Sequence, residues 1–227
     1  MSAAQKTLVM ASVVGLGGLL APGCYGNALT EFPAGFEPWE AQMSEPAPGT
    51  PTDPCPETLV HVESRGYMGG RPAAVHASAC IHAPLATVWA GVQDPQTARD
   101  PGVNRWTLFD APMSECADGA FETGINAGSP VSVDFRLCFR FAVAAGTEAA
   151  PTRVVARWQK VFGTTAISTL EGSIVLEPFP GDPSFTIVDY QYHLAAATTG
   201  PSNYQTINEY LDVIYDRLRR RSHGETL

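Results

Sequence analysis

The sequence predicts an α+β fold in which an antiparallel sheet packs against one long C-terminal helix. Residues 131–143 alternate between apolar and polar side chains, and successive side chains of a strand point to opposite faces, so this stretch predicts a strand with one buried face. Near the C-terminus, apolar residues recur at helical spacing: Tyr204, Ile207, Leu211, Ile214 and Leu218. This stripe predicts an amphipathic helix over residues 202–221, with its apolar side against the sheet.

The remaining elements can be placed in order along the chain. Residues 59–65 and 74–82 alternate like strands, and the glycine pair between them favours a hairpin. Pro84 suits the start of a short helix, and Asp94 with the proline after it predicts a second one that ends near residue 100. The pattern thus predicts two short helices after the first strand.

The middle of the chain is a series of alternating segments separated by glycine-containing turns. Five strand candidates follow the short helices: 105–110, 120–125, 131–143, 153–162 with 166–177 behind it, and 185–195. Together with the two earlier strands, they predict an antiparallel sheet of about seven strands.

The N-terminus has the layout of a secretory signal peptide, which we assign to residues 1–23. Lys6 precedes an uncharged, mostly apolar run over 8–20, which is shorter than the ~20 residues of a membrane helix. A buried N-terminal helix is the alternative, but the glycines of this run oppose it. The stretch Leu-Leu-Ala-Pro-Gly-Cys that ends at Cys24 resembles a bacterial lipoprotein box, although Ala21 stands where that family prefers leucine. This resemblance implies lipidation of Cys24; ordinary cleavage, for example after Ala28, is the alternative.

Residues 24–56 are rich in proline and predict an extended tether before a domain at 57–227. Phe32, Phe36 and Trp39 are the exceptions within the tether, and they either dock on the domain or are scattered apolar residues of a linker. We expect an exported protein, held at the membrane only through a lipid anchor. It would face the periplasm or the cell surface, and without the anchor it would be secreted.

The formal net charge of -9 and a pI near 4.9 argue against nucleic acid as a partner, because an acidic surface repels phosphate backbones. The one basic cluster, residues 219–221, suits the C-terminal end of a helix. No cofactor is indicated, and no Cys/His cluster has the spacing of a metal site.

Five cysteines are present, and four remain if Cys24 carries lipid. An even number in an oxidising compartment predicts two disulfides. A turn centred near residue 128 would set residue 118 opposite Cys138 and bring Cys116 within reach of it. A turn at 69–70 would bring Cys55 near Cys80. We therefore predict Cys116–Cys138 and Cys55–Cys80; four buried, reduced cysteines are the alternative.

Residues 81–94, Ile-His-Ala-Pro-Leu-Ala-Thr-Val-Trp-Ala-Gly-Val-Gln-Asp, resemble the opening of the START-like superfamily of lipid-transfer, pollen-allergen and polyketide-cyclase proteins. The resemblance extends by order of elements over residues 74–221. It implies a helix-grip fold, in which a curved sheet wraps the long helix and leaves a cavity for an apolar molecule. An apolar small molecule, such as a lipid or a polyketide-like compound, is the expected partner.

Side-chain alternation and the helix stripe select the residues that would line such a cavity. They are Val133, Phe135, Leu137, Phe139, Trp158, Tyr190, Tyr192, Ile207, Leu211 and Ile214. In 153–162 the face of Trp158 is chosen because the opposite face carries two arginines, which are costlier to bury than one lysine. The polar set Asp189, Gln191 and His193 is expected to face water.

No nucleophile, base and orienting group emerge as a set, so the sequence favours a binding domain over an enzyme. Two other functions remain open: a polyketide-cyclase-type enzyme on the same fold, and a structural lipoprotein with a filled core that binds a protein partner.

Overall fold

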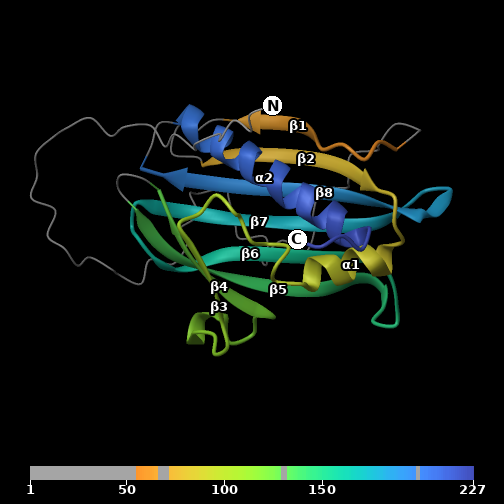
Figure 1. Cartoon of the computed structure of the whole chain (residues 1–227), viewed down its shortest axis with the longest axis horizontal. Coiled ribbons are helices and arrows are strands. Elements are labelled where there is room, and N and C mark those ends of the chain that lie inside the picture. The colour runs from red at the N-terminus through yellow and green to blue at the C-terminus, as the bar shows by residue number, and fades with distance from the viewer. Residues whose placement is uncertain (1–54, 66–71, 129–131, 198–199) are drawn as a thin grey trace, which may run out of the picture.

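The computed structural model describes residues 55–65, 72–128, 132–197 and 200–227. They form one eight-stranded antiparallel sheet in the order β1-β2-β8-β7-β6-β5-β4-β3, with one helix after β2 and one at the C-terminus (Figure 1). The strands are β1 Val60–Arg65, β2 Ala73–Ile81, β3 Arg105–Phe109, β4 Phe121–Ala127, β5 Val133–Thr147, β6 Ala150–Gly163, β7 Ile167–Phe179 and β8 Asp182–Ala196. The helices are α1 Leu85–Gln93, the short 3-10 helix η1 Ser114–Cys116 and α2 Gly200–Ser222. The expected signal peptide 1–23, the lipidation site Cys24 and the tether up to residue 54 lie outside the described residues.

The structure confirms the α+β helix-grip fold and corrects two of its details. The sheet has eight strands instead of about seven, because residues 166–177, treated as a continuation of the previous strand, form β7 in their own right. One α-helix, instead of two, connects the opening strands to β3, and it follows the second strand. Residues 94–100 form turns, in which the Asp94 carboxylate accepts a hydrogen bond from the Gln96 amide at 2.9 Å and the Asp94 carbonyl accepts one from Thr97 at 2.9 Å. These local bonds satisfy the backbone without a further helical turn.

The core lies between the sheet and the two α-helices. Helix α2 crosses β1, β2 and β8, and α1 lies beside α2 against β6, β7 and β8 (Figure 1). The predicted stripe of α2 is buried against the sheet, with Ile207 and Leu218 1% exposed and Leu211 fully buried. No helix among the described residues is long and apolar enough to cross a membrane.

A row of directly paired residues runs across five strands on the inner face of the sheet. Phe121 of β4 pairs with Phe139 of β5, then Trp158 of β6, Gly172 of β7 and Tyr192 of β8. The glycine in this row makes room for the tryptophan, since a Cβ at residue 172 would lie 2.2 Å from the Trp158 ring. The ring therefore lies across β7 and reaches Tyr192, with 5.6 Å between ring centroids.

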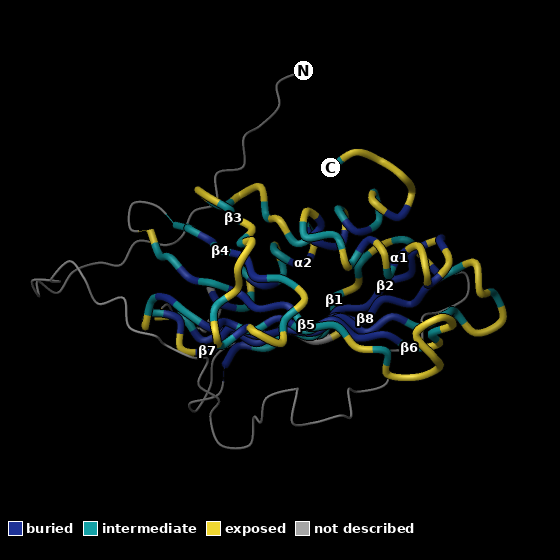
Figure 2. The backbone as a smooth tube through the Cα atoms, turned by 90° about the horizontal axis from the view of Figure 1, so that it is seen from below, coloured by how far each residue is buried: buried dark blue, intermediate teal, exposed yellow. Residues whose placement is uncertain are grey.

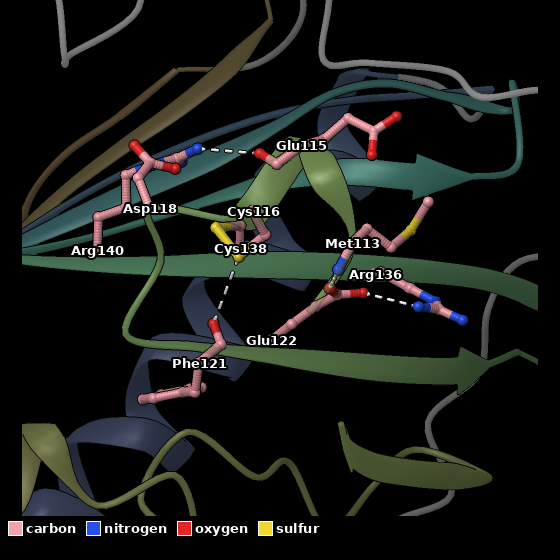
Figure 3. Close-up of a disulfide and its surroundings, with 9 residues drawn as sticks. All are labelled: Met113, Glu115, Cys116, Asp118, Phe121, Glu122, Arg136, Cys138 and Arg140. Atoms are coloured by element: carbon pink, nitrogen blue, oxygen red, sulfur yellow. Dashed lines mark hydrogen bonds and ion pairs between the residues drawn. A yellow bond between two sulfur atoms is a disulfide. The ribbon is translucent and has the colours of Figure 1, made fainter. Parts of the chain in front are cut away.

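Both expected disulfides are present: Cys55–Cys80 with Cα atoms 5.6 Å apart and Cys116–Cys138 with Cα atoms 5.5 Å apart. The register behind the second expectation is wrong, because β4 sets Glu122, and not residue 118, opposite Cys138. Cys116 reaches its partner from η1, which folds back beside β5 (Figure 3). A Cβ at residue 119 would lie 2.4 Å from the Cys116 sulfur, so only glycine lets the backbone pass this close to the disulfide.

The fully buried Glu122 fixes the loop that carries this disulfide. Its carboxylate accepts hydrogen bonds from the Met113 amide at 2.6 Å and from Arg136 Nη1 at 3.0 Å (Figure 3). The Arg136 guanidinium also stacks on the Phe109 ring at 3.9 Å. The buried carboxylate is thus paired and hydrogen-bonded, as burial of a charge requires.

The expectation that Asp189, Gln191 and His193 face water is wrong for two of the three. Gln191 is half-buried, but Asp189 is 1% exposed and His193 is 8% exposed, although both lie on the face of the sheet opposite α1 and α2. Each is paired across strands: His76 Nε2 with Asp189 Oδ1 at 2.5 Å, and His193 Nδ1 with Glu171 Oε1 at 3.0 Å. We call this side the outer face.

Candidate functional site

The core contains a small pocket between the helices and the inner face of the sheet. Its volume is about 40 Å³. The lining comes from the end of α1 and the turn after it, from strands β5 to β8 and from α2: Val92, Thr97, Ala98, Phe139, Ala156, Trp158, Ile174, Tyr190, Tyr210, Ile214 and Leu218. Val92, Ala98 and Tyr210 are only partly buried, so they mark the side on which the pocket approaches solvent.

The turn at residues 94–98 forms one wall of this pocket, and α2 holds it in place. Arg221 Nη2 contacts the Asp94 carboxylate at 2.6 Å, and Arg217 Nη2 donates to the Gln96 carbonyl at 2.7 Å. Burial, together with nearby arginines, lowers the pKa of Arg217. Exposed polar contacts of this kind contribute little to stability, so the wall is held mainly by its own packing, with Thr97 4% exposed and Ala98 packed against the core.

Three residues of this otherwise apolar lining carry a buried polar atom without a hydrogen bond to any described residue: Thr97 Oγ1, Trp158 Nε1 and Tyr190 Oη. Trp158 Nε1 approaches the Tyr192 hydroxyl but does not meet hydrogen-bond geometry. Tyr190 is 1% exposed, and burial, with a smaller effect of Tyr215, raises its pKa far above the ordinary tyrosine value. Its hydroxyl is therefore neutral at physiological pH and able to donate a hydrogen bond.

Four of the ten residues predicted to line a cavity line this pocket: Phe139, Trp158, Tyr190 and Ile214. The other six belong to the same core but lie away from the pocket: Val133, Phe135, Leu137, Tyr192, Ile207 and Leu211. The lining also includes residues that the sequence did not select, above all Thr97 and Ala98. They lie in the stretch expected to be a second helix, and a turn places their side chains differently.

The described residues bring no catalytic set together in this pocket, whose polar lining atoms are hydroxyls and one indole nitrogen. The paired imidazoles and carboxylates of β2, β7 and β8 lie on the outer face, on the other side of the sheet. Within the described ranges, no three His, Cys, Asp or Glu side chains form a group that could hold a metal ion.

No protein-family model and no curated protein sequence matches this chain. Solved structures are similar to about two thirds of it. The lipid transfer and protein localization domain of human StarD13 is 14% identical, over 66% of this chain and 77% of that one, with a TM-score of 0.45. A START superfamily protein from Mycobacterium smegmatis is 16% identical, over 66% and 97%, with a TM-score of 0.45. A protein from Thermus thermophilus is 14% identical, over 66% and 97%, with a TM-score of 0.46. A likeness at this level identifies neither a ligand nor an activity.

Proposed function

We propose that this chain is an exported, lipid-anchored domain that binds a small apolar molecule with one oxygen-bearing end in the pocket between α2 and the sheet. The anchor would be Cys24. The observation that carries the proposal is that three residues lining one apolar pocket carry a buried polar atom without a hydrogen bond to any described residue: Thr97 Oγ1, Trp158 Nε1 and Tyr190 Oη. Binding sites for small molecules combine an apolar lining with a few polar groups that fix orientation.

The hydrogen-bonding capacity of these three groups determines which polar group the bound molecule would need. The indole nitrogen is a donor only, and the two hydroxyls donate or accept. A carbonyl or hydroxyl oxygen at the end of an apolar body would meet at least one donor. A buried polar group without a partner costs about 1–3 kcal/mol, and the bound oxygen would remove that cost.

The pocket must widen to admit such a molecule, because about 40 Å³ is the space of a few water molecules at most. The turn at residues 94–98 is the wall that we expect to move. Its two polar contacts with α2, from Arg217 and Arg221, involve partly exposed arginines and can break in contact with solvent.

A direct test compares two alanine-to-tryptophan variants. Ala98→Trp places a large ring at the partly buried side of the pocket, whereas Ala90→Trp places the same ring on the exposed side of α1. The apolar fluorescent probe N-phenylnaphthylamine should bind the wild type and Ala90→Trp at one saturable site. Its affinity for Ala98→Trp should fall about tenfold or more, as expected when a site loses about 1.4 kcal/mol of binding free energy.

The small volume itself favours a second function, a structural lipoprotein whose filled core supports binding of a protein partner. This function predicts no saturable binding of the probe to the wild type. It also predicts that Ala98→Trp destabilises the fold without any change in binding. Absence of wild-type binding would therefore reject the ligand-binding proposal in favour of this one.

A further inference from the structure

The outer face of the sheet is buried in its centre, although α1 and α2 lie on the other side. Ser173 is 0% exposed, Asp189 1%, and Glu171 and Val175 2% each. Figure 2 colours the strands around β2 and β8 as buried over much of their length. An antiparallel sheet with helices on one side ordinarily leaves its other face in water, so the burial requires a covering layer.

The described residues on this side reach only the margins of the face. At one margin, η1 is joined to outward-facing Cys138 of β5. At another, residues 55–59 lie beside the end of β2, where Cys55 pairs with Cys80 and the Pro56 carbonyl accepts a hydrogen bond from the Cys80 amide at 3.2 Å. Among the described residues, no element crosses the centre formed by β8, β7 and β6.

We propose that residues 25–54 of this same chain lie on the outer face and cover its centre. The disulfide holds the first described residue of the domain against this face, because Cys55 packs with Cys80 and the outward-facing Ile187 of β8. The chain just before it therefore begins at the edge of the buried area. An extended segment of this length spans ~100 Å at about 3.3–3.6 Å per residue, which is enough to run along a strand and return.

The charges of the segment and the face are complementary. Residues 25–54 contain no lysine or arginine and five acidic residues: Glu31, Glu37, Glu40, Glu45 and Asp53. On the face, the half-buried Arg140 and Arg157 are direct cross-strand partners. Like charges opposite each other destabilise a sheet, and Arg140 has the Asp118 carboxylate at 3.1 Å as one counterion. An acidic segment above them would supply more.

The apolar content is also matched. Val155 is 6% exposed and Val175 2% exposed, and they pair directly with each other on the outer face. The segment carries four aromatic residues, Tyr25, Phe32, Phe36 and Trp39, and the last three stand among its prolines. Aromatic side chains bury more apolar area than other side chains and dominate the energetics of such contacts. The aromatic residues of the segment would thus cover the valines of the face, and its acidic residues would pair with the arginines.

Chemical labelling of histidine in the full-length chain tests the proposal. Diethyl pyrocarbonate modifies accessible imidazoles, and mass spectrometry reports each site. His193 lies on the outer face near the end of β8 and its side chain is 10% exposed, whereas the His223 side chain beyond α2 is 31% exposed and serves as an internal reference. In the wild type, we expect His193 to react much more slowly than His223.

A triple variant, Phe32→Ala, Phe36→Ala and Trp39→Ala, should raise the His193 rate about tenfold or more while His223 is unchanged, because local protection is lost with the covering contacts. A matched control changes three polar residues of the same segment, Asn27→Ala, Gln42→Ala and Ser44→Ala, and should keep His193 protected.

Three outcomes would overturn the proposal. The first is continued protection of His193 in the aromatic variant, and the second is a wild-type His193 that reacts as fast as His223. The third is a loss of wild-type protection on dilution, which would make a second copy of the chain the cover. Circular dichroism on both variants establishes that any new reactivity does not come from unfolding.

Discussion

Two of the buried tyrosines of the core, Tyr190 and Tyr215, should respond in opposite directions to the same substitution. Tyr190 lines the pocket and its Oη has no hydrogen bond to a described residue, whereas Tyr215 Oη donates to the Cys80 carbonyl at 2.8 Å. Both side chains are buried, at 1% and 5% exposure. Replacing each by phenylalanine removes one oxygen and keeps the ring, so the pair isolates the contribution of the hydroxyl.

The magnitudes follow from the state of each hydroxyl. An unsatisfied buried hydroxyl costs about 1–3 kcal/mol, so Tyr190→Phe should raise the free energy of unfolding by up to that amount. Tyr215→Phe should lower it by about 0.5–1.5 kcal/mol, because a made hydrogen bond is lost. For a domain of this size, each kcal/mol shifts the melting temperature by about 2–4 °C. Thermal unfolding followed by circular dichroism, with urea unfolding as a second measurement, resolves shifts of that size.

The ligand adds a second readout. If the Tyr190 hydroxyl serves the bound molecule, Tyr190→Phe should weaken binding of an oxygen-bearing apolar probe, while Tyr215→Phe should not. The reasoning fails if Tyr190→Phe destabilises the protein as much as Tyr215→Phe does. That result would mean that Tyr190 Oη already has a stabilising partner and that the pocket is an ordinary part of the core.

Two further predictions address packing and localisation. Gly172→Ala should cost about 1–3 kcal/mol, because the new Cβ would lie 2.2 Å from the Trp158 ring and the core is already full; an unchanged melting temperature would show that the ring moves freely. Cys24→Ala should move the protein from the membrane fraction to the soluble fraction, because acyl chains would be its only anchor; retention at the membrane would contradict lipidation of Cys24 as the cause.

The sequence predicted the parts of the fold whose pattern is strictly local. Alternation placed Phe135, Leu137 and Phe139 on one buried face of β5, and the 3.6-residue period placed the stripe of α2 in the core. The choice between the two faces of β6 also succeeded. Trp158 is buried in the core, and Lys160, on the same face, is fully buried with its ammonium donating to the Ile167 carbonyl at 2.6 Å. A single cation at the end of a strand finds a carbonyl more easily than two arginines would.

Register and turn geometry were not accessible in the same way. A turn centred at residue 128 gives one pairing of β4 with β5, and the structure uses another that sets Glu122 opposite Cys138. Cys116 still reaches Cys138 because η1 folds back, which depends on the missing Cβ of Gly119 and on the buried Glu122. These contacts join residues of different elements, and alternation within one strand carries no information about contacts between elements.

The outer face shows the same limit in another form. Alternation reports which side chains of β8 share a face, and it correctly separates Asp189 and His193 from Tyr190 and Tyr192. It does not report what covers each face. A polar face is usually solvated, so water was the natural expectation, yet Asp189 and His193 are buried and each is paired with a side chain of a neighbouring strand. A buried ion pair is stable only when its lone pairs and protons are satisfied and the pair is shielded in a defined geometry. The pairing of both histidines with carboxylates therefore explains how polar side chains tolerate burial on this face, and their low exposure is the observation that calls for a cover.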